Sequence, residues 1–521
     1  MTMTDSEASM GLEMATSRKE REEQEKAAYE ERVKDPITGA IGNLGPWQIT
    51  VCMFIFLVKF PVGWHQLSTV FLAPTPSFTC IAPSNLTDAC SADCEEIKYD
   101  TSVFTNTIIT EWNLICSQKY LASWVQTLFM FGILVGSMLF GVLSDKYGRR
   151  PPLVLAVLLQ LVCGVGEAFV PWFIVFAILR FLLAVATGGS MVTSFVLTME
   201  IVGPKKRETM SILYQIPFNI GHTTLPLFAY FLRDWRWFQF AISIVSVIYI
   251  SYYWILPESP RWLLANGKID EVEKLLVAGA ERNNRSTKTI RSDLDEHMKR
   301  KALLSETDLK EKAHGTLINL FRYPNLRIRT LIMGFNWLVC GLTYFGVSQY
   351  IGEISGNIFI NVAISGIIGI PGTLISIPAT KVLGRKKALI LSNCVAGVSL
   401  LMIAVLGKKG SWIQVALASI GVFGMSVSFP NVYLYGGELF PTVARNAGMG
   451  FLSMAARIGA MVAPFVSGTS SIYGWLPAVL FGCPSLIASL LVLLLPETKG
   501  QALPETIEDG ENFGKKKTGE K

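Results

Sequence analysis

Long apolar segments alternate with short polar segments along most of the chain. Each apolar segment is about 20 residues long, which is the length that a helix needs to cross ~30 Å of hydrocarbon. The pattern predicts twelve membrane-spanning helices and an all-α membrane protein. The first six helices are expected at residues 47–72, 120–143, 152–170, 172–199, 211–232 and 237–256. The second six are expected at residues 330–351, 358–382, 388–406, 412–435, 448–467 and 473–495.

Composition agrees with a membrane protein. Hydrophobic residues make up 51% of the 521 residues and charged residues only 17%, against roughly 25% charged in a soluble domain. The formal net charge is +6, but the basic residues cluster at the ends of the expected helices, so the positive-inside rule explains them better than nucleic-acid binding does. The segment before the first helix has mixed charge and no apolar run, so no cleavable signal peptide is expected.

Basic clusters set the expected orientation. They follow the second, fourth and eighth helices, and both termini contain basic residues too, so these parts should be cytoplasmic. The clusters are Lys146 with Arg149 and Arg150, Lys205 with Lys206 and Arg207, and Lys381 with Arg385, Lys386 and Lys387. Two basic pairs fall on the expected outer side and weaken this assignment without reversing it: Arg233 with Arg236, and Lys408 with Lys409.

The loop at residues 73–119 is then extracellular. It contains four cysteines and one glycosylation sequon, at Cys80, Cys90, Cys94, Cys116 and Asn85. We expect disulfides among the four cysteines and a glycan on Asn85. Four cysteines allow three pairings, and the sequence does not choose among them. Free thiols are the alternative interpretation.

Three pairs of short motifs repeat at offsets of 236 to 239 residues. "YGRR" matches "LGRK", "EIVGPKKR" matches "ELFPTVAR", and "PESPR" matches "PETKG". Such a repeat indicates two homologous bundles of six helices each. The expected organisation is a cytoplasmic segment at 1–46, a first bundle at 47–256, a cytoplasmic helical linker at 257–329, a second bundle at 330–495 and a cytoplasmic tail at 496–521.

Duplicated halves favour a secondary transporter, whose substrate site lies between the halves near the bilayer midplane. The sequence contains no Walker A motif and no selectivity-filter motif, so direct ATP drive and channel behaviour are disfavoured. Catalysis and cofactor or metal binding are not expected either, because no Ser-His-Asp set or metal-ligand spacing is apparent around the four histidines. These are His65, His222, His297 and His314.

Arg457 lies about ten residues into an apolar helix, roughly 15 Å deep. A charge at that depth costs about 2.5–3.5 kcal/mol on insertion scales, so it should face a cavity or a partner. Lys59 and Arg180 are the other deep basic residues, whereas Glu167 is the one embedded acid. The surplus of positive charge predicts that an anionic group of the substrate neutralises Arg457. The alternative is that backbone carbonyls or Glu167 hold Arg457.

Lys59 has two interpretations. A buried lysine can lose its proton and serve a proton or anion step, or it can bond a carbonyl near Pro61.

Other cavity candidates come from helical stripes of polar and aromatic residues. They are Asn219, His222, Thr223, Pro226 and Tyr230 in the fifth helix, Trp337, Gly341, Tyr344 and Ser348 in the seventh, and Ser426, Phe429 and Tyr433 in the tenth. Aromatic faces can hold an organic body or an ammonium group. Ordinary helix packing is the alternative role for each aromatic residue.

Several motifs resemble a known family. "GVLSDKYGRR" from Gly141 resembles the signature loop between the second and third helices of the major facilitator superfamily. "TEWNLIC", "PESPRWLL", "YGGELFPTVARNAGMG" and "LLPETKGQALPETIED" resemble solute carrier family 22, the organic cation, organic anion and carnitine transporters. The resemblance implies the twelve-helix major facilitator fold and a plasma-membrane carrier of small organic ions that uses alternating access.

The signature loop predicts a latch at the cytoplasmic gate. Gly141 and Gly148 permit close approach and a tight turn, and Asp145 offers a carboxylate to Arg149, to Arg150 or to helix ends of the other half. The resemblance implies that further charged residues at equivalent inner ends join this latch: Glu200, Arg207, Glu258, Arg261, Glu438 and Arg445. Solvated interfacial charges are the alternative interpretation.

The resemblance also bears on the substrate. Cation carriers of the family have aspartate at the position of Arg457, whereas anion and carnitine-type carriers have arginine. Substrate-binding positions of the anion carriers match Tyr230, Tyr344, Phe345 and Phe429, and His65 matches a cavity position. Thr373 stands where anion exchangers of the family have lysine, which puts dicarboxylate-driven exchange in doubt.

These matches favour an anion or a zwitterion, such as a carnitine-like molecule or a β-amino acid, with no coupling ion assigned. Two alternatives stay open. In the first, the protein carries organic cations, which the aromatic residues and Glu167 bind. In the second, it is a nutrient receptor that transports nothing.

Overall fold

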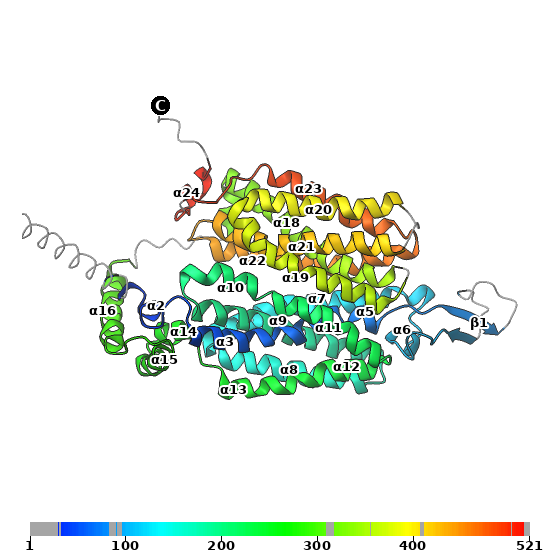
Figure 1. The fold of residues 1–521 in the computed structure, drawn as a ribbon, viewed down its shortest axis with the longest axis horizontal. Coiled ribbons are helices and arrows are strands. Elements are labelled where there is room, and N and C mark those ends of the chain that lie inside the picture. Colours follow the sequence, from blue (N-terminus) through cyan, green and yellow to red (C-terminus); the bar gives the residue numbers. More distant parts are fainter. Residues whose placement is uncertain are drawn as a thin grey trace, which may run out of the picture. The chain divides into compact units, whose positions relative to one another are not determined.

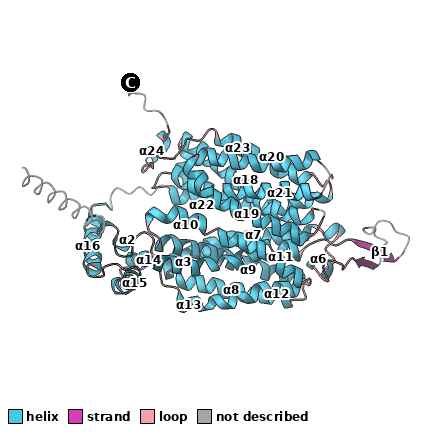
Figure 2. Ribbon diagram, viewed as in Figure 1, coloured by secondary structure: helices cyan, strands magenta, loops and turns pink. Residues whose placement is uncertain are grey.

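The computed structural model is almost entirely helical (Figures 1 and 2). It describes residues 30, 33–82, 90, 96–308, 317–354, 356–406, 411–501 and 503–514. Five residues of the sequence analysis lie outside this part: Asn85, Cys94, His314, Lys408 and Lys409. The chain divides into two compact units. The small unit contains residues 1–53, 197–207 and 257–312, and the large unit contains residues 54–196, 208–256 and 313–521.

Helices of the first half begin with a broken span. The span expected at 47–72 consists of α3 (Pro46–Leu57), α4 (Lys59–Leu67) and α5 (Thr69–Leu72). Pro61 has no N–H for the carbonyl of Leu57, which explains the break between α3 and α4. The helices that follow are α7 (Tyr120–Tyr147), α8 (Arg150–Phe169), α9 (Phe173–Ile201), α10 (Arg207–Leu213), α11 (Ile216–Phe231), α12 (Trp235–Ile244), a 3-10 helix (Val245–Ser251) and α13 (Tyr252–Ile255).

Helices of the second half are longer and less interrupted. They are α17 (Leu317–Arg322), α18 (Pro324–Glu353), α19 (Ile358–Val382), α20 (Arg385–Leu406), α21 (Ser411–Leu439), α22 (Arg445–Gly468), α23 (Leu476–Val492) and α24 (Ile507–Asn512). A short 3-10 helix (Thr469–Ser471) follows α22. Within the described ranges, ten helical segments are long and apolar enough to cross a membrane. The two remaining expected spans correspond to α11, with 16 residues, and α23, with 17. The all-α membrane fold expected from the sequence is confirmed.

Glycines let helices of the large unit approach closely. A Cβ at Gly341 in α18 would lie 2.0 Å from the carbonyl oxygen of Ala456 in α22. In the same interface, a Cβ at Gly459 would lie 2.0 Å from the carbonyl oxygen of Leu338. Small residues at such crossings are the usual means by which membrane helices pack. This contact positions the helix that carries Arg457.

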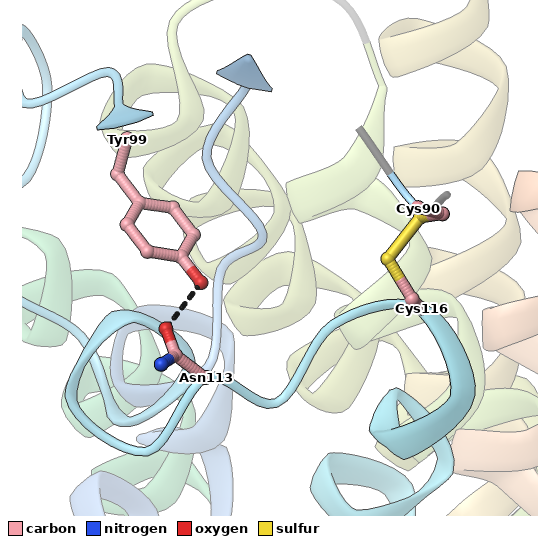
Figure 3. The surroundings of a disulfide bond; sticks show 4 residues. All are labelled: Cys90, Tyr99, Asn113 and Cys116. Carbon is pink, nitrogen blue, oxygen red and sulfur yellow. Dashed lines mark hydrogen bonds between the residues drawn. A yellow bond between two sulfur atoms is a disulfide. The ribbon is translucent and has the colours of Figure 1, made fainter. Parts of the chain in front are cut away.

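The loop between α5 and α7 contains a small hairpin. Strands β1 (Phe78–Ala82) and β2 (Glu96–Tyr99) pair antiparallel, with Phe78 opposite Tyr99. A short helix, α6 (Ile108–Glu111), and a 3-10 turn (Cys116–Gln118) follow. Cys90 and Cys116 form a disulfide with a Cα–Cα distance of 5.5 Å, and the Tyr99 hydroxyl donates to Asn113 at 2.8 Å nearby (Figure 3). Cys80 is also disulfide-bonded, so the prediction of disulfides in this loop is confirmed.

An ion pair ties this loop to the first half. Arg236, at the start of α12, pairs with Glu111 at 2.5 Å. Glu111 also accepts hydrogen bonds from Trp235 at 3.1 Å and Asn106 at 2.6 Å. Burial raises the pKa of Glu111, but the hydrogen bonds from Arg236, Asn106 and Trp235 outweigh it and hold the pKa below its ordinary value. Arg236, which stood as an exception to the charge pattern, therefore has a structural partner at this end of the helix.

The small unit surrounds its own apolar core. Its helices are α2 (Pro36–Ile41), α14 (Pro260–Ala265), α15 (Ile269–Arg282) and α16 (Ile290–Asp308), with a 3-10 turn at Pro204–Lys206. Buried apolar residues of α2, α15 and α16 pack together: Ile37, Ile41, Val272, Leu276, Ala280 and Leu294. Asn283 connects α2 with α3, because it accepts from the Trp47 amide at 2.9 Å and donates to the Ile41 carbonyl at 2.9 Å.

Candidate functional site

A central cavity in the large unit has walls from both six-helix halves. It encloses about 540 Å³ of empty space, counting the part open to solvent. The first half contributes residues of α4, α9 and α11 and the residue before α11: Lys59, Gln66, Met191, Gln215, Phe218 and Asn219. The second half contributes residues of α18, α19, α21 and α22: Tyr344, Phe345, Thr373, Ser426, Phe429, Pro430, Tyr433 and Arg457.

Arg457 lines this cavity from α22. Its side chain is buried, with 8% of its surface exposed. In the described part of the chain, no hydrogen bond or ion pair joins it to another residue. Tyr433 lies on the same wall, one helix away, with its ring 4.2 Å from the ring of Trp337. Arg457 is thus a buried guanidinium that faces a cavity without a protein carboxylate.

Lys59 lines the cavity from the opposite half. Its side chain is 2% exposed, and its Nζ lies 4.3 Å from the centre of the Tyr214 ring. A cation above an aromatic face is favourable but does not neutralise the charge. The Tyr214 hydroxyl lies 2.6 Å from the Ser194 hydroxyl, which fixes the ring. No described carbonyl near Pro61 accepts a hydrogen bond from Lys59. The described part of the structure therefore does not contain the hydrogen bond that the second interpretation of Lys59 requires.

Arg180 and Glu167 form a separate pair away from the cavity. Arg180 Nη1 lies 3.3 Å from Glu167 Oε2, and both side chains are fully buried. Arg180 also donates to the Ser68 hydroxyl at 2.7 Å and to the His65 carbonyl at 3.3 Å. Glu167 therefore compensates Arg180, and Lys59 and Arg457 remain as the two deep basic residues without a described carboxylate partner. The alternative pairing of Glu167 with Arg457 does not occur in this structure.

Aromatic side chains form one wall of the cavity. The Tyr344 ring lies 5.4 Å from the Phe345 ring and 5.9 Å from the Phe429 ring, both in edge-on contact. The Tyr344 hydroxyl donates to Asn219 Oδ1 at 3.1 Å, and Asn219 donates to the Thr373 hydroxyl at 2.7 Å. Asn219 therefore connects α11 of the first half with α18 and α19 of the second.

Eight residues expected at the site lie outside the described lining of this cavity: His65, His222, Thr223, Pro226, Tyr230, Trp337, Gly341 and Ser348. Tyr230 is 48% exposed, and its ring packs edge-on against Phe359 at 5.5 Å. His65 and His222 are buried within the first half, with 0% and 1% exposure. A helical stripe spans more than one depth of the membrane, so residues on one face need not reach one cavity.

Sequence reasoning also missed several lining residues. Gln215 lies four residues before Asn219, and Gln66 lies seven residues after Lys59. Helical periodicity could have identified both residues, because these spacings place them on the same helix faces as Asn219 and Lys59. Met191, Phe218 and Pro430 carry no comparable signal, because apolar residues on a membrane helix face lipid, protein or cavity alike.

The signature loop forms a local ion pair. Asp145 lies 2.7 Å from Arg149, which also donates to the Ser144 carbonyl at 2.7 Å. The Arg150 guanidinium lies over the Tyr253 ring at 5.2 Å. Gly148 has φ +96° and ends α7, as the expected tight turn requires. The expected close approach at Gly141 is wrong, because a Cβ there would meet nothing within 4 Å.

The matching loop of the second half has a cluster of charged and polar residues around Arg385. Arg385 lies 2.8 Å from Glu438 and 3.9 Å from Glu208, which belongs to the first half. The Glu497 carboxylate accepts from the Arg385 amide at 2.9 Å, and the Thr498 hydroxyl donates to Glu438 at 2.6 Å. Sequence reasoning placed Glu438 in the latch but named Arg385 only in a basic cluster, although Arg385 lies 236 residues after Arg149, at the offset of the repeat.

Three further residues of the expected latch have described contacts. Arg445 donates to the Thr442 hydroxyl at 3.3 Å. In the small unit, Arg261 pairs with Asp35 at 3.0 Å, and Arg207 donates to the Val202 carbonyl at 3.2 Å. The small unit also contains Glu200 and Glu258.

The two halves of the large unit meet closely at the end near the hairpin loop. Phe71 of α5 stacks on Phe359 of α19, with ring centres 5.8 Å apart. Phe104 of the loop contacts the same ring at 5.5 Å. A Cβ at Gly352 would lie 2.6 Å from Val70. Aromatic and aliphatic side chains therefore bring the two halves into contact at this end.

Comparisons with known proteins agree with this architecture. A family model described as sugar (and other) transporter matches residues 49–509. The chain is 35% identical to the organic cation transporter protein of Drosophila melanogaster, over 92% of this chain and 95% of that protein. It is 35% identical to solute carrier family 22 member 3 of Mus musculus, over 82% and 75%. It is 32% identical to organic anion transporter 3 of Oryctolagus cuniculus, over 92% and 93%.

Solved structures show the same fold. The inward open conformation of the xylose transporter from E. coli aligns with a TM-score of 0.63 and 16% identity, over 89% of this chain and 99% of that one.

Proposed function

This chain belongs to solute carrier family 22, and we propose that it moves small organic anions or zwitterions across the plasma membrane by alternating access. One observation carries the proposal: Arg457 and Lys59 line the central cavity, and no carboxylate is among its described lining residues. The chain is a membrane transporter by its family, so the proposal concerns the substrate, the site and the cycle.

The charge of the cavity supports an anionic group on the substrate. Burying a cation in a membrane protein is costly unless a partner or water compensates it. A carboxylate can accept two parallel hydrogen bonds from the Arg457 guanidinium, which is a strong and directional contact. The organic body would then rest on Tyr344, Phe345 and Phe429, which lie on the same cavity.

The contacts between the halves support a cycle of alternating access. We propose that Phe71, Phe104 and Phe359, whose rings are in contact, close the cavity near the hairpin loop. At the other end, Arg385 and Glu208 are 3.9 Å apart, long for a salt bridge. We propose that the hairpin end is extracellular, that the segments at 1–46, 257–329 and 496–521 are cytoplasmic, and that this conformation faces inward. Breaking the aromatic contacts and tightening the Arg385 cluster would turn the cavity outward.

An organic cation is the second candidate substrate. The family includes relatives named as organic cation transporters, at 35% identity to this chain. Tyr344 and Phe429 could hold an ammonium group by cation-π contact. In that case Arg457 would have a structural role, and its positive charge would oppose binding.

Uptake measurements separate these candidates. Cells that express the wild type, Arg457→Ala, Arg457→Lys or the exposed control Arg327→Ala are given radiolabelled L-carnitine, nicotinate or tetraethylammonium. We expect uptake of the zwitterion or the carboxylate in the wild type. Arg457→Ala should reduce it by at least about 30-fold, because a buried charge pair is worth roughly 2–5 kcal/mol. Arg457→Lys should retain part of it, and Arg327→Ala all of it.

The opposite pattern contradicts the proposal. Tetraethylammonium uptake that survives Arg457→Ala, with no uptake of L-carnitine or nicotinate in the wild type, would favour the cation carrier. Surface biotinylation of each variant separates loss of transport from loss of the protein at the cell surface.

A further inference from the structure

A broad hollow in the small unit is unrelated to the central cavity. Its volume is about 1670 Å³. Residues of α2, α14 and α16 line it, together with the loop before α3 and the turn after α9. Pockets for single small molecules usually measure about 300–1,000 Å³. The hollow is thus a docking surface rather than a closed pocket.

Basic side chains dominate the lining of this hollow. Six basic residues face three acidic ones: Lys34, Lys205, Arg261, Arg285, Arg300 and Lys301 against Glu30, Asp35 and Asp293. Asp35 compensates Arg261 at 3.0 Å, and Glu296 compensates Arg300 at 3.2 Å. Burial raises the pKa of Asp35, but the hydrogen bond from Thr38 and the charge of Arg261 outweigh this effect and hold the pKa below its ordinary value. The carboxylate therefore stays ionised at neutral pH.

The other four basic residues are not compensated in this way. Within the described ranges, no ion pair joins a carboxylate to any of them: Lys34, Lys205, Arg285 and Lys301. Arg285 donates to the neutral carbonyl of Gly39 at 3.4 Å, which leaves its charge in place. Lys34, Lys205 and Lys301 are exposed, so their ammonium groups are accessible to a ligand.

The rim of the hollow lies where two membrane-spanning helices end. Asn43 lies three residues before α3, and its carbonyl accepts from the Gly203 amide at 2.9 Å. Its side chain accepts from the Lys205 amide at 3.2 Å. Gly203 and Lys205 follow directly after α9. Both α3 and α9 belong to segments long and apolar enough to cross a bilayer. The hollow therefore adjoins the ends of two helices that are long and apolar enough to cross a bilayer.

We propose that this basic hollow binds the phosphorylated headgroup of an anionic phospholipid in the adjoining leaflet. Lysine ammonium and arginine guanidinium groups form charge-assisted hydrogen bonds with phosphate oxygens. Clusters of basic residues next to a membrane-spanning helix attract anionic lipids, most strongly those with several phosphates. A lipid occupant explains both the excess charge and the place of the hollow beside α3 and α9. The inference is independent of the substrate of the central cavity.

A binding measurement on the purified full-length protein in mild detergent tests this proposal. The probe is a fluorescent short-chain phosphatidylinositol 4,5-bisphosphate, measured by anisotropy. The triple variant Lys34→Ala, Lys205→Ala, Lys301→Ala removes three charges from the hollow. The matched control Lys268→Ala, Lys274→Ala, Lys299→Ala removes three exposed charges of the same unit that do not line the hollow. Thermal unfolding of both variants checks that they fold.

We expect the hollow variant to bind the probe on the order of 100-fold more weakly. Each basic residue near anionic lipid increases the affinity by a factor of about five, and the variant lacks three of them. The control should change affinity less than about threefold, because salt screens distant charges. Equal weakening in both variants, or none in the hollow variant, would overturn the proposal.

A second arm distinguishes a lipid from a free phosphate. Soluble inositol 1,4,5-trisphosphate carries the same headgroup without acyl chains. It should compete with the probe poorly, since the hollow adjoins the ends of α3 and α9, where acyl chains can enter the detergent micelle. Competition by the trisphosphate as strong as by the unlabelled lipid would show a soluble-phosphate site and contradict the lipid assignment. Short-chain phosphatidylcholine should not compete at all.

Discussion

Lys59 and Arg457 reach the same cavity from opposite halves, and each lacks a carboxylate partner among the described residues. Two like charges in one buried space repel each other and have lost most of their hydration. The empty site is therefore electrostatically unfavourable, and an anionic ligand would relieve it. A binding site commonly holds such a conflict because the ligand resolves it.

Replacing Lys59 with Met tests this conflict. Met has a similar length without the charge, so Lys59→Met should stabilise the empty protein by roughly 1–4 kcal/mol, as removal of buried charge often does. The same change should weaken the stabilisation that added L-carnitine or nicotinate produces. Thermal unfolding of the purified protein with and without each compound measures both effects.

Lys59→Arg provides the matched control, because it keeps the charge at nearly the same place. It should gain no stability from loss of charge. A Lys59→Met variant that is less stable than the wild type, with unchanged stabilisation by either compound, would show that Lys59 has a structural role instead.

Residue types alone did not reveal which deep cations are compensated. Arg457 and Arg180 look equivalent in the sequence, since both lie inside apolar helices. The contact between Arg180 and Glu167 depends on the tight connection between α8 and α9, which run antiparallel as neighbours. Both residues lie within a few turns of that connection, so the pairing could have been inferred from the helix order. The position of Lys59 beside the cavity could not, because it depends on how the broken first span bends.

At the scale of elements, the crossing of α18 and α22 determines where Arg457 and Tyr344 lie. Gly341 and Gly459 bring the two backbones into contact. At each glycine, a carbonyl oxygen of the partner helix lies where a Cβ would otherwise be. Arg457 lies two residues before Gly459, and Tyr344 lies three residues after Gly341. Any separation of these helices would move both site residues.

Alanine at Gly459 should therefore disturb stability and transport together. Its Cβ would lie 2.0 Å from the Leu338 carbonyl oxygen, a contact that only a shift of the helices can relieve. Overpacking of this kind costs about 1–3 kcal/mol. We expect Gly459→Ala to lower the thermal stability by that amount and to reduce uptake of the transported probe. Thermal unfolding and the uptake assay measure the two effects.

Gly450 provides a matched control on the same helix, where an added Cβ would meet nothing within 4 Å. Gly450→Ala should be neutral, or stabilising by up to about 1 kcal/mol through helix propensity. A Gly459→Ala variant as stable as Gly450→Ala would show that the two helices do not pack this closely.

Hydrophobic length predicted the number of spans and most of their positions. It did not predict how individual spans break. The fifth span was expected from residue 211, but α11 begins at Ile216 after a separate α10. Pro217 explains this start, because it cannot donate to the carbonyl of Leu213. Proline in the sequence gave a signal here, as it did at Pro61, and reading it would have located both breaks.

At the scale of the whole chain, the internal repeat predicted the duplicated fold. Arg149 and Arg385 occupy equivalent turns, each after a glycine with positive φ. Arg149 pairs with Asp145 four residues before it, and Arg385 pairs with Glu438 and approaches Glu208. The repeat predicts the backbone geometry of these turns, but it does not identify the partners of their side chains. The conformation of a carrier also depends on differences of a few kcal/mol between states, which sequence patterns do not report.

A cross-link at the closed end tests whether transport requires that end to open. A Cβ at Gly352 would lie 2.6 Å from Cγ1 of Val70, so the two Cβ atoms would be at most about 4 Å apart, within the range for a disulfide. In the double variant Val70→Cys, Gly352→Cys, oxidation should join the two halves. We expect uptake to fall to near background after oxidation, because the substrate can no longer reach the cavity from that side. Uptake by whole cells before and after oxidation, with cross-linking monitored by mass spectrometry, measures this.

Each single variant and the wild type receive the same oxidant and reductant, since the native disulfide Cys90–Cys116 in the hairpin loop also responds to reduction. Reduction should restore uptake in the double variant to the level of the singles. If the cross-link forms in most molecules and uptake continues, this end of the protein does not open during transport. Substrate would then have to enter by another route, and the rocking of the two halves would not describe this carrier.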